Sequence, residues 1–159
     1  MDVSPAHDQA GKRGGSGSRR RGRALAMKLL YQAELGGRSL DDLCRNFEEY
    51  EAAPDHVKKF ALELARGVLE RRDEMDEKIA GALERWDFKR LAAVDMQLLR
   101  LALYEMLFCD DISANVAISE AIELSRQYST AQSSRFVNGV LGKLCDMYAP
   151  HKVTRTRKG

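Results

Sequence analysis

Four arginines stand close together near the start of the chain, directly before a segment with helical apolar spacing. They are Arg19, Arg20, Arg21 and Arg23. The positive end of a helix dipole disfavours cations in the first turn, so a helix that serves only the fold would carry acidic residues there. Guanidinium groups bind phosphates bidentately and lie flat on nucleobases. The cluster therefore predicts contact with something negative, either single-stranded RNA or acidic side chains of the protein itself.

Two further residues of the same predicted helix extend this first candidate site. Lys28 adds a cation one turn beyond the arginines, and Tyr31 follows it by three residues. Tyr31 is open to two interpretations, because its ring could stack on a base or belong, half-buried, to the core.

The segment YSTAQSSRFVNG forms a second candidate site. Ser129, Thr130 and Gln132 allow a cap, and Ser129 and Gln132 have the spacing of a capping box, which predicts a helix start. A helix start carries free N–H groups and a positive dipole end, so it attracts phosphate. Arg135 falls in the early turns of that helix, while Tyr128 and Phe136 flank it with rings. Those rings suit base stacking, with core packing as the alternative for Phe136.

Some charged residues interrupt the most apolar stretches. Arg100, Glu105 and Glu120 are of this kind, and so is Asp95. Because a buried charge needs a partner, we interpret the first three as members of buried or half-buried ion pairs. Asp95 is the one for which an external partner is considered.

Catalytic and metal chemistry find no support in the sequence. The three cysteines and three histidines are scattered without CxxC spacing, and no glycine-rich phosphate loop follows a strand pattern. We therefore expect a protein that is not an enzyme and has no metal or cofactor. The cysteine usage suits a reducing cytoplasm, and no apolar run approaches the roughly 20 residues of a membrane span.

Charge is distributed unevenly along the chain. Residues 1–23 hold six Lys/Arg and two Asp, and residues 151–159 hold four Lys/Arg and no acid. The remaining 16 basic and 22 acidic residues give residues 24–150 a net negative charge. Nucleic acid would thus meet the ends and a selected face, and the acidic body suits a basic protein partner.

The elements that position these residues are predicted to be helices. Residues 1–18 are rich in Gly and Ser and are expected to be disordered. Residues 19–150 are expected to form one all-α domain, and residues 151–159 a basic tail. About seven helices are predicted: 19–35, a short one after Ser39, one opening with Pro54 at its first position, 73–85, 90–108, 114–128 and 130–148.

Three segments resemble the NusB family of bacterial transcription antitermination factors. They are RRRGRALAMKLLYQAEL, LLRLALYEM and DISANVAISEAIELSRQYSTAQSSRFVNGVLGKL, in order along most of the chain. The resemblance implies a helical bundle of two three-helix subdomains plus an extra helix. It also implies binding of boxA-type single-stranded RNA from ribosomal RNA leader transcripts, together with the ribosomal small-subunit protein NusE. The resulting complex helps RNA polymerase read through terminators.

The resemblance also bears on single residues. The four arginines match the family's arginine-rich motif, whereas Gly22 stands where the family tends to have a better helix former. Asp95 matches an acidic family position on the side expected to face NusE. Gln132 stands where family members often carry an acid.

Two alternative functions remain open at this point. One is a protein-interaction module that holds a ribosomal protein. The other is a detached accessory domain of an rRNA cytosine methyltransferase, although no methyl-donor segment is present in the sequence.

Overall fold

The computed structural model describes residues 16–83 and 91–153, and this part of the chain consists of helices and their connections, without strands. The predicted all-α class is therefore confirmed. The helices are α2 (Ser16–Leu35), α3 (Leu40–Asn46), α4 (Glu48–Ala52), α5 (Asp55–Glu70), α6 (Arg72–Ala82), α7 (Ala93–Phe108), α8 (Ala114–Tyr128), α9 (Ala131–Tyr148) and the 3-10 helix η2 (Pro150–Lys152). Most of the expected N-terminal extension and basic tail, residues 1–15 and 154–159, lies outside the described residues.

Helix ends follow from local chemistry. Gly37 has φ of 64°, a left-handed conformation that glycine adopts without strain, and it follows the end of α2. The Oγ of Ser39 then accepts a hydrogen bond from the backbone N–H of Asp42, which caps α3 as predicted. Ser113 caps α8 in the same way, through the N–H of Val116.

Several predicted helix boundaries differ from the structure: α6 spans Arg72–Ala82 rather than 73–85, and α7 begins at Ala93 rather than residue 90. α2 begins at Ser16 rather than residue 19. Pro54 precedes α5 rather than opening it, because its carbonyl already accepts from the N–H of Lys58. The short helix α4 was not predicted, since five residues are too few to show a helical apolar period.

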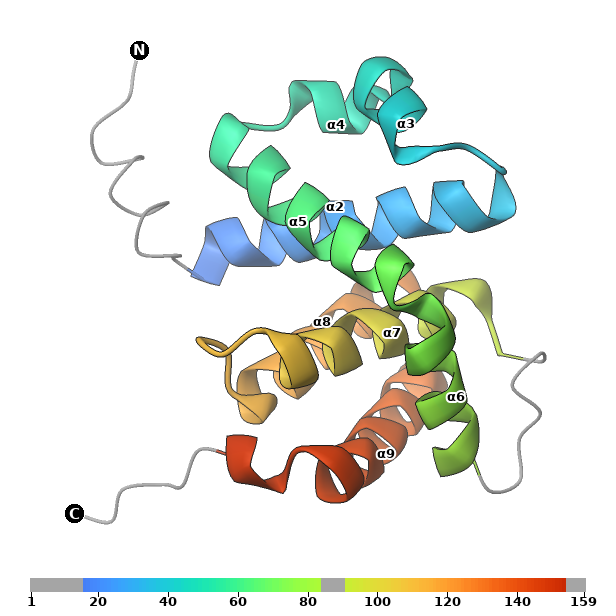
Figure 1. The fold of residues 1–159 in the computed structure, drawn as a ribbon, viewed down its shortest axis with the longest axis vertical. Helices are drawn as coiled ribbons and strands as arrows, with labels where there is room; N and C mark the ends of the chain where they lie inside the picture. The colour runs from blue at the N-terminus through green and yellow to red at the C-terminus, as the bar shows by residue number, and fades with distance from the viewer. Residues whose placement is uncertain (1–15, 84–90, 154–159) are drawn as a thin grey trace. The chain divides into compact units, whose positions relative to one another are not determined.

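The chain divides into two compact units, residues 1–66 and residues 67–159, in agreement with the two expected subdomains. In the first unit α3 contacts both α2 and α4 (Figure 1). Leu35 at the end of α2 is 56% exposed, but most other apolar positions of α2 and α5 are buried, as their three-and-four spacing predicts. They include Leu25, Leu29, Leu30, Val57, Ala61 and Leu64.

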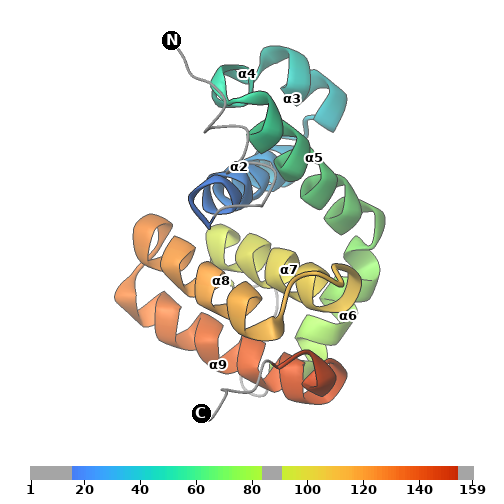
Figure 2. The same cartoon turned by 90° about the vertical axis from the view of Figure 1, so that its left-hand side faces the viewer.

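The second unit is built around α7. The helices α7, α8 and α9 contact one another pairwise, and α6 contacts α7 and α9 (Figure 2). Eleven of the sixteen residues of α7 are buried, which confirms the prediction that this helix is apolar on nearly all sides and central. The largest fully buried side chains of its core cluster are Met75, Ile79, Leu99, Leu103, Met106, Leu141 and Leu144.

Candidate nucleic-acid interface

The arginine cluster lies on the first turns of α2, and its members differ in exposure. Arg20 and Arg21 are exposed, Arg19 is half-buried and Arg23 is only 3% exposed. Arg23 stands three and four residues before the buried Ala26 and Met27, on the inner side of the helix. Arg23 therefore belongs to the buried face of α2, unlike the exposed Arg20 and Arg21.

A single aromatic ring organises the inner arginines. The guanidinium carbon of Arg19 lies 4.8 Å from the centroid of the Phe60 ring, and that of Arg23 lies 5.6 Å from it. Both distances are within cation–π range. The ring comes from α5, and the sequence analysis did not single it out because Phe60 fits the apolar stripe of its own helix.

Lys28 and Tyr31 have different surroundings. The Nζ of Lys28 lies 2.6 Å from Oε2 of Glu49 on α4, so this cation forms an ion pair within the protein. Tyr31 is 36% exposed. Part of this side chain is therefore accessible to a ligand, and both interpretations of Tyr31 stay predictions.

The second candidate site lies at the start of α9, where the cap differs from the prediction. Thr130, rather than Ser129, is the cap residue, and its Oγ1 accepts from the backbone N–H of Ser133. Ser129 instead donates its hydroxyl to Oγ of Ser133, at 2.9 Å. The predicted capping box of Ser129 and Gln132 is therefore wrong, because the helix begins two residues beyond Ser129 and the threonine occupies the capping position.

Asp95 of α7 joins this second site. The Oγ of Ser133 donates to Oδ2 of Asp95 at 2.8 Å, and the side chain is 5% exposed. Within the described part of the chain, Oδ1 of Asp95 is buried without a hydrogen-bond partner. A buried carboxylate oxygen in this state is costly unless a donor reaches it.

A hollow of about 270 Å³ lies beside this carboxylate. Its lining consists of Leu91, Ala92, Asp95, Thr130, Gln132, Ser133 and Phe136. Phe136 also packs against the core cluster, so the two interpretations of its ring, core packing and a face toward a ligand, are compatible. Arg135, which directly precedes Phe136 on α9, is exposed, and Tyr128 is half-buried at the end of α8.

Two charged residues of the second unit form the buried ion pair that was expected. Nε of Arg100 lies 2.6 Å from Oδ1 of Asp76, and its Nη2 donates to Oδ2 at 2.8 Å. This bidentate contact confirms the interpretation for Arg100. Glu105 and Glu120 are buried as well, with 1% and 8% exposure.

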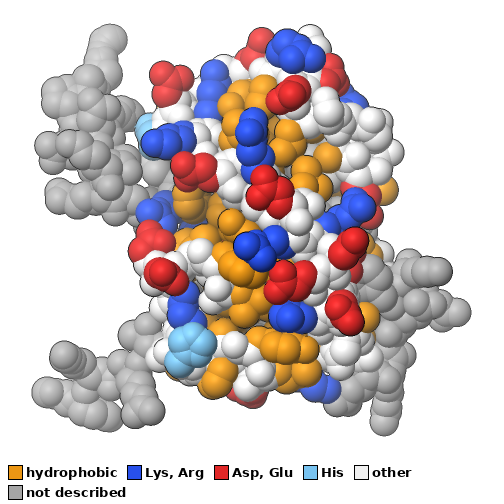
Figure 3. Space-filling view, in the orientation of Figure 1, with side chains coloured by type: hydrophobic (Ala, Val, Ile, Leu, Met, Phe, Trp, Pro, Cys, Tyr) orange, Lys and Arg blue, Asp and Glu red, His pale blue; other side chains and the backbone are white. Residues whose placement is uncertain are grey.

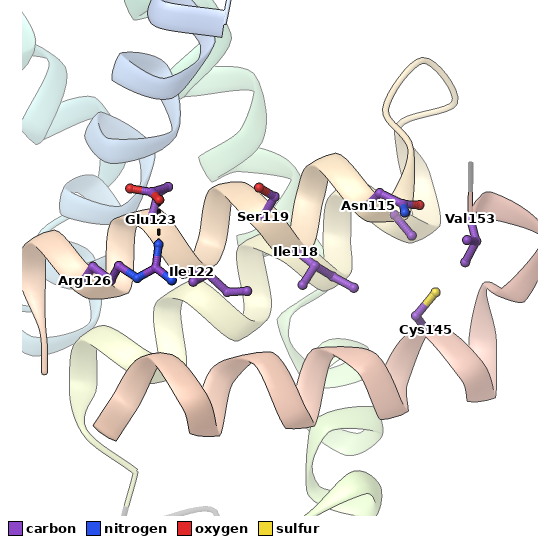
Figure 4. Close-up of a pocket in the computed structure, with 9 residues that line it drawn as sticks. Asn115, Ile118, Ser119, Ile122, Glu123, Arg126, Cys145 and Val153 are labelled. Carbon is purple, nitrogen blue, oxygen red and sulfur yellow. Dashed lines mark hydrogen bonds and ion pairs between the residues drawn. The ribbon is translucent and has the colours of Figure 1, made fainter. Parts of the chain in front are cut away.

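A larger hollow, of about 360 Å³, runs along α8 (Figure 4). Ile118 and Ile122 line it, and Cys145 of α9 and Val153 lie at one end. The ion pair between Arg126 and Glu123 lies at the other end. Burial raises the pKa of the Cys145 thiol, so this cysteine is a poor nucleophile. No pattern in the sequence indicated this hollow, and it shares no lining residue with the hollow beside Asp95.

Basic and acidic side chains alternate on the face of each unit that Figure 3 shows. Residues 16–83 and 91–153 hold no group of three or more His, Cys, Asp or Glu that could bind a metal ion. None of the described helices is both long and apolar enough to span a membrane.

Comparison with known proteins gives consistent results. The sequence profile of the NusB family matches residues 20–146. A transcription antitermination protein NusB from Geobacter sulfurreducens is 42% identical over 129 residues, with 80% of this chain and 94% of the relative covered. A NusB protein from Clostridium botulinum (strain Kyoto / Type A2) is 37% identical over 141 residues, and the match covers 80% of this chain and 99% of the relative.

Solved structures also match. The chain resembles NusB from T. maritima with a TM-score of 0.74 and 38% identity, covering 84% of this chain and 94% of that one. It also resembles a chain in a structure of the antitermination factors NusB and NusE in complex with double-stranded RNA. There the TM-score is 0.74 and the identity 25%, and the match covers 82% of this chain and 98% of that one.

Proposed function

The chain belongs to the NusB family, and we propose that it is a transcription antitermination factor. In this proposal it binds boxA-type single-stranded RNA of ribosomal RNA leader transcripts together with NusE. The complex promotes read-through by RNA polymerase, which places the protein in the cytoplasm. The protein acts by binding and performs no catalysis.

The observation that carries the proposal is the pair of exposed arginines on the first turns of α2. Arg20 and Arg21 are exposed, and Arg19 beside them is held over the Phe60 ring. A helix start with adjacent guanidinium groups favours an anion with several phosphates in a row. Arg23 takes part from the inner side of the helix, through the same ring.

The hollow beside Asp95 suits a base rather than a phosphate. Oδ1 of Asp95 requires a donor, and the exocyclic and ring N–H groups of nucleobases are donors. The ring of Phe136 in the lining offers a stacking face, while the exposed Arg135 could hold an adjacent phosphate. Gln132, uncharged where relatives often have an acid, adds no repulsion toward RNA.

The remaining predicted contacts are assigned to RNA or to NusE. Tyr31 and Tyr128 are proposed as further stacking faces, and Lys28 as a cation that RNA could recruit from its ion pair with Glu49. NusE is proposed to meet the acidic surface of the body. The role of Asp95 in NusE binding stays a prediction, and its 5% exposure leaves little area for a protein contact.

The proposal is tested by titrating a fluorescently labelled boxA-type RNA with the full chain, alone and in the presence of NusE. A base-scrambled RNA of equal length is the control. We expect tighter binding to the boxA-type RNA, and a further gain with NusE. Binding of NusE without binding of either RNA would instead support the protein-interaction module.

A further inference from the structure

Two turns of α5 contact two turns of α2 at matching helical spacing. Nε2 of His56 lies 3.1 Å from Oγ of Ser18, which makes a hydrogen bond between the two helices. Four residues later on each helix, Phe60 meets Gly22. Residues four apart lie on one face of a helix, so His56 and Phe60 together form a support for the start of α2.

The contact with Gly22 is unusually close. A Cβ atom built on Gly22 would lie 2.5 Å from Cδ2 of the Phe60 ring, a separation at which one group must move. Glycine at this position therefore lets the ring lie against the helix backbone. This accounts for a residue that otherwise weakens a helix interior, and which departs from the family pattern.

The same ring lies within cation–π range of Arg19 and Arg23, which precede and follow Gly22. An arginine side chain has many rotamers, and a binding site loses affinity when it must order them on association. Because the Phe60 ring already holds both guanidinium groups in the free protein, fewer side-chain rotamers have to be ordered when RNA binds. It also fixes the turn that presents Arg20 and Arg21 on the outer side.

We propose that Phe60 is a positioning residue for RNA binding: its ring, seated on Gly22, holds the arginine segment in its binding conformation without contacting RNA. The inference rests on the proposed RNA-binding function. It assigns part of the RNA affinity to a residue on α5, outside the arginine-rich segment itself.

Two single substitutions test the role of the ring. Phe60→Leu removes the π face while keeping an apolar side chain, and we expect the RNA dissociation constant to rise about five- to tenfold, because the arginine side chains must then be ordered when RNA binds. Phe60→Tyr keeps the π face and should stay within about twofold of wild type. Phe47→Leu is the matched control, because it removes another half-buried ring from the same unit at the α3–α4 junction.

A substitution at Gly22 separates positioning from helix order. Gly22→Ala improves helix propensity but displaces the ring, so it should weaken RNA binding. If helix order alone governed affinity, this variant would bind RNA more tightly. In a double variant with Phe60→Ala the new methyl no longer meets the Cγ or Cδ2 atoms, so its affinity should not fall below that of Phe60→Ala alone.

All variants are compared by fluorescence anisotropy with the boxA-type RNA and by thermal unfolding. Wild-type affinity in Phe60→Leu with a lowered Tm would reduce Phe60 to a core residue and overturn the inference. The inference would also be overturned if Gly22→Ala and the substitution of Phe60 weakened RNA binding independently, so that their fold-changes in the dissociation constant multiplied in the double variant. Failure of the proposed function itself is distinguishable, because the wild-type chain would then not bind the RNA.

Discussion

Removing the two exposed arginines of α2 tests whether they contact phosphates. Arg20→Ala together with Arg21→Ala should lower RNA affinity and flatten its salt dependence. Each phosphate contact to a single strand contributes about 0.7 to the log–log slope, so two contacts contribute about 1.4. Between about 50 and 200 mM salt, a fourfold range, the affinity deficit of the variant should therefore shrink by roughly sevenfold.

The assay is fluorescence anisotropy with the boxA-type RNA at four or five salt concentrations. Arg45→Ala with Lys59→Ala is the charge-matched control, since both residues are exposed in the same unit but lie on other helices. This control should leave the slope close to wild type. Unfolding by urea should show that neither double variant loses much stability, because exposed substitutions usually change it by less than about 0.5 kcal/mol.

Arg23 supplies the sharpest contrast within the cluster. Being 3% exposed, it should not contribute a phosphate contact of its own. Arg23→Met should therefore lower stability while leaving the salt slope unchanged. The reasoning fails if the Arg20 and Arg21 variant keeps the wild-type slope, or if Arg23→Met flattens the slope as much as that variant does.

Three further predictions concern the second unit and are checked by urea unfolding. Asp76→Ala should destabilise it by about 2–4 kcal/mol because it leaves the buried Arg100 guanidinium without its bidentate partner; an effect below about 1 kcal/mol would contradict this. Leu141→Ala should cost about 2–5 kcal/mol, as for other fully buried leucines, and a smaller loss would mean that the core closes around the cavity. Thr130→Ala should lower the free energy of unfolding by about 1 kcal/mol because α9 loses its cap. An unchanged free energy of unfolding would mean that another residue caps the helix.

The helices were predictable from the sequence because long amphipathic segments carry their own period. α8 begins and ends as predicted, and α9 begins within one residue, because Ser113 and Thr130 are strong local capping residues. α4 was missed because its five residues carry no period, and its three glutamates suggest only surface. The capping box was misplaced because Ser129 and Thr130 are adjacent and both types cap helices, so the sequence does not decide between them.

The candidate site was predictable in its residue types but not in its contacts. Sequence identified the arginines and the start of α9, since both depend on local chemistry. The support from Phe60 could not be predicted, because it depends on how α5 crosses α2. The position of Asp95 was missed for the same reason, since its contact with Ser133 joins residues 38 apart in the sequence.

These two long-range contacts suggest how affinity and base choice are divided in the proposed function. The proposal assigns phosphate binding to the arginines of α2, and because every RNA offers phosphates, these contacts would supply affinity with little discrimination. The carboxylate of Asp95 is oriented by Ser133 through Oδ2, which leaves Oδ1 for a donor. Because Oδ1 is buried, the proposal requires a side chain of the lining to move when RNA binds. A base that then presents an N–H group satisfies this oxygen, whereas a base that presents an acceptor leaves it unsatisfied and adds repulsion. Discrimination between bases should therefore arise at the start of α9, where a polar group is buried, rather than at the exposed arginines.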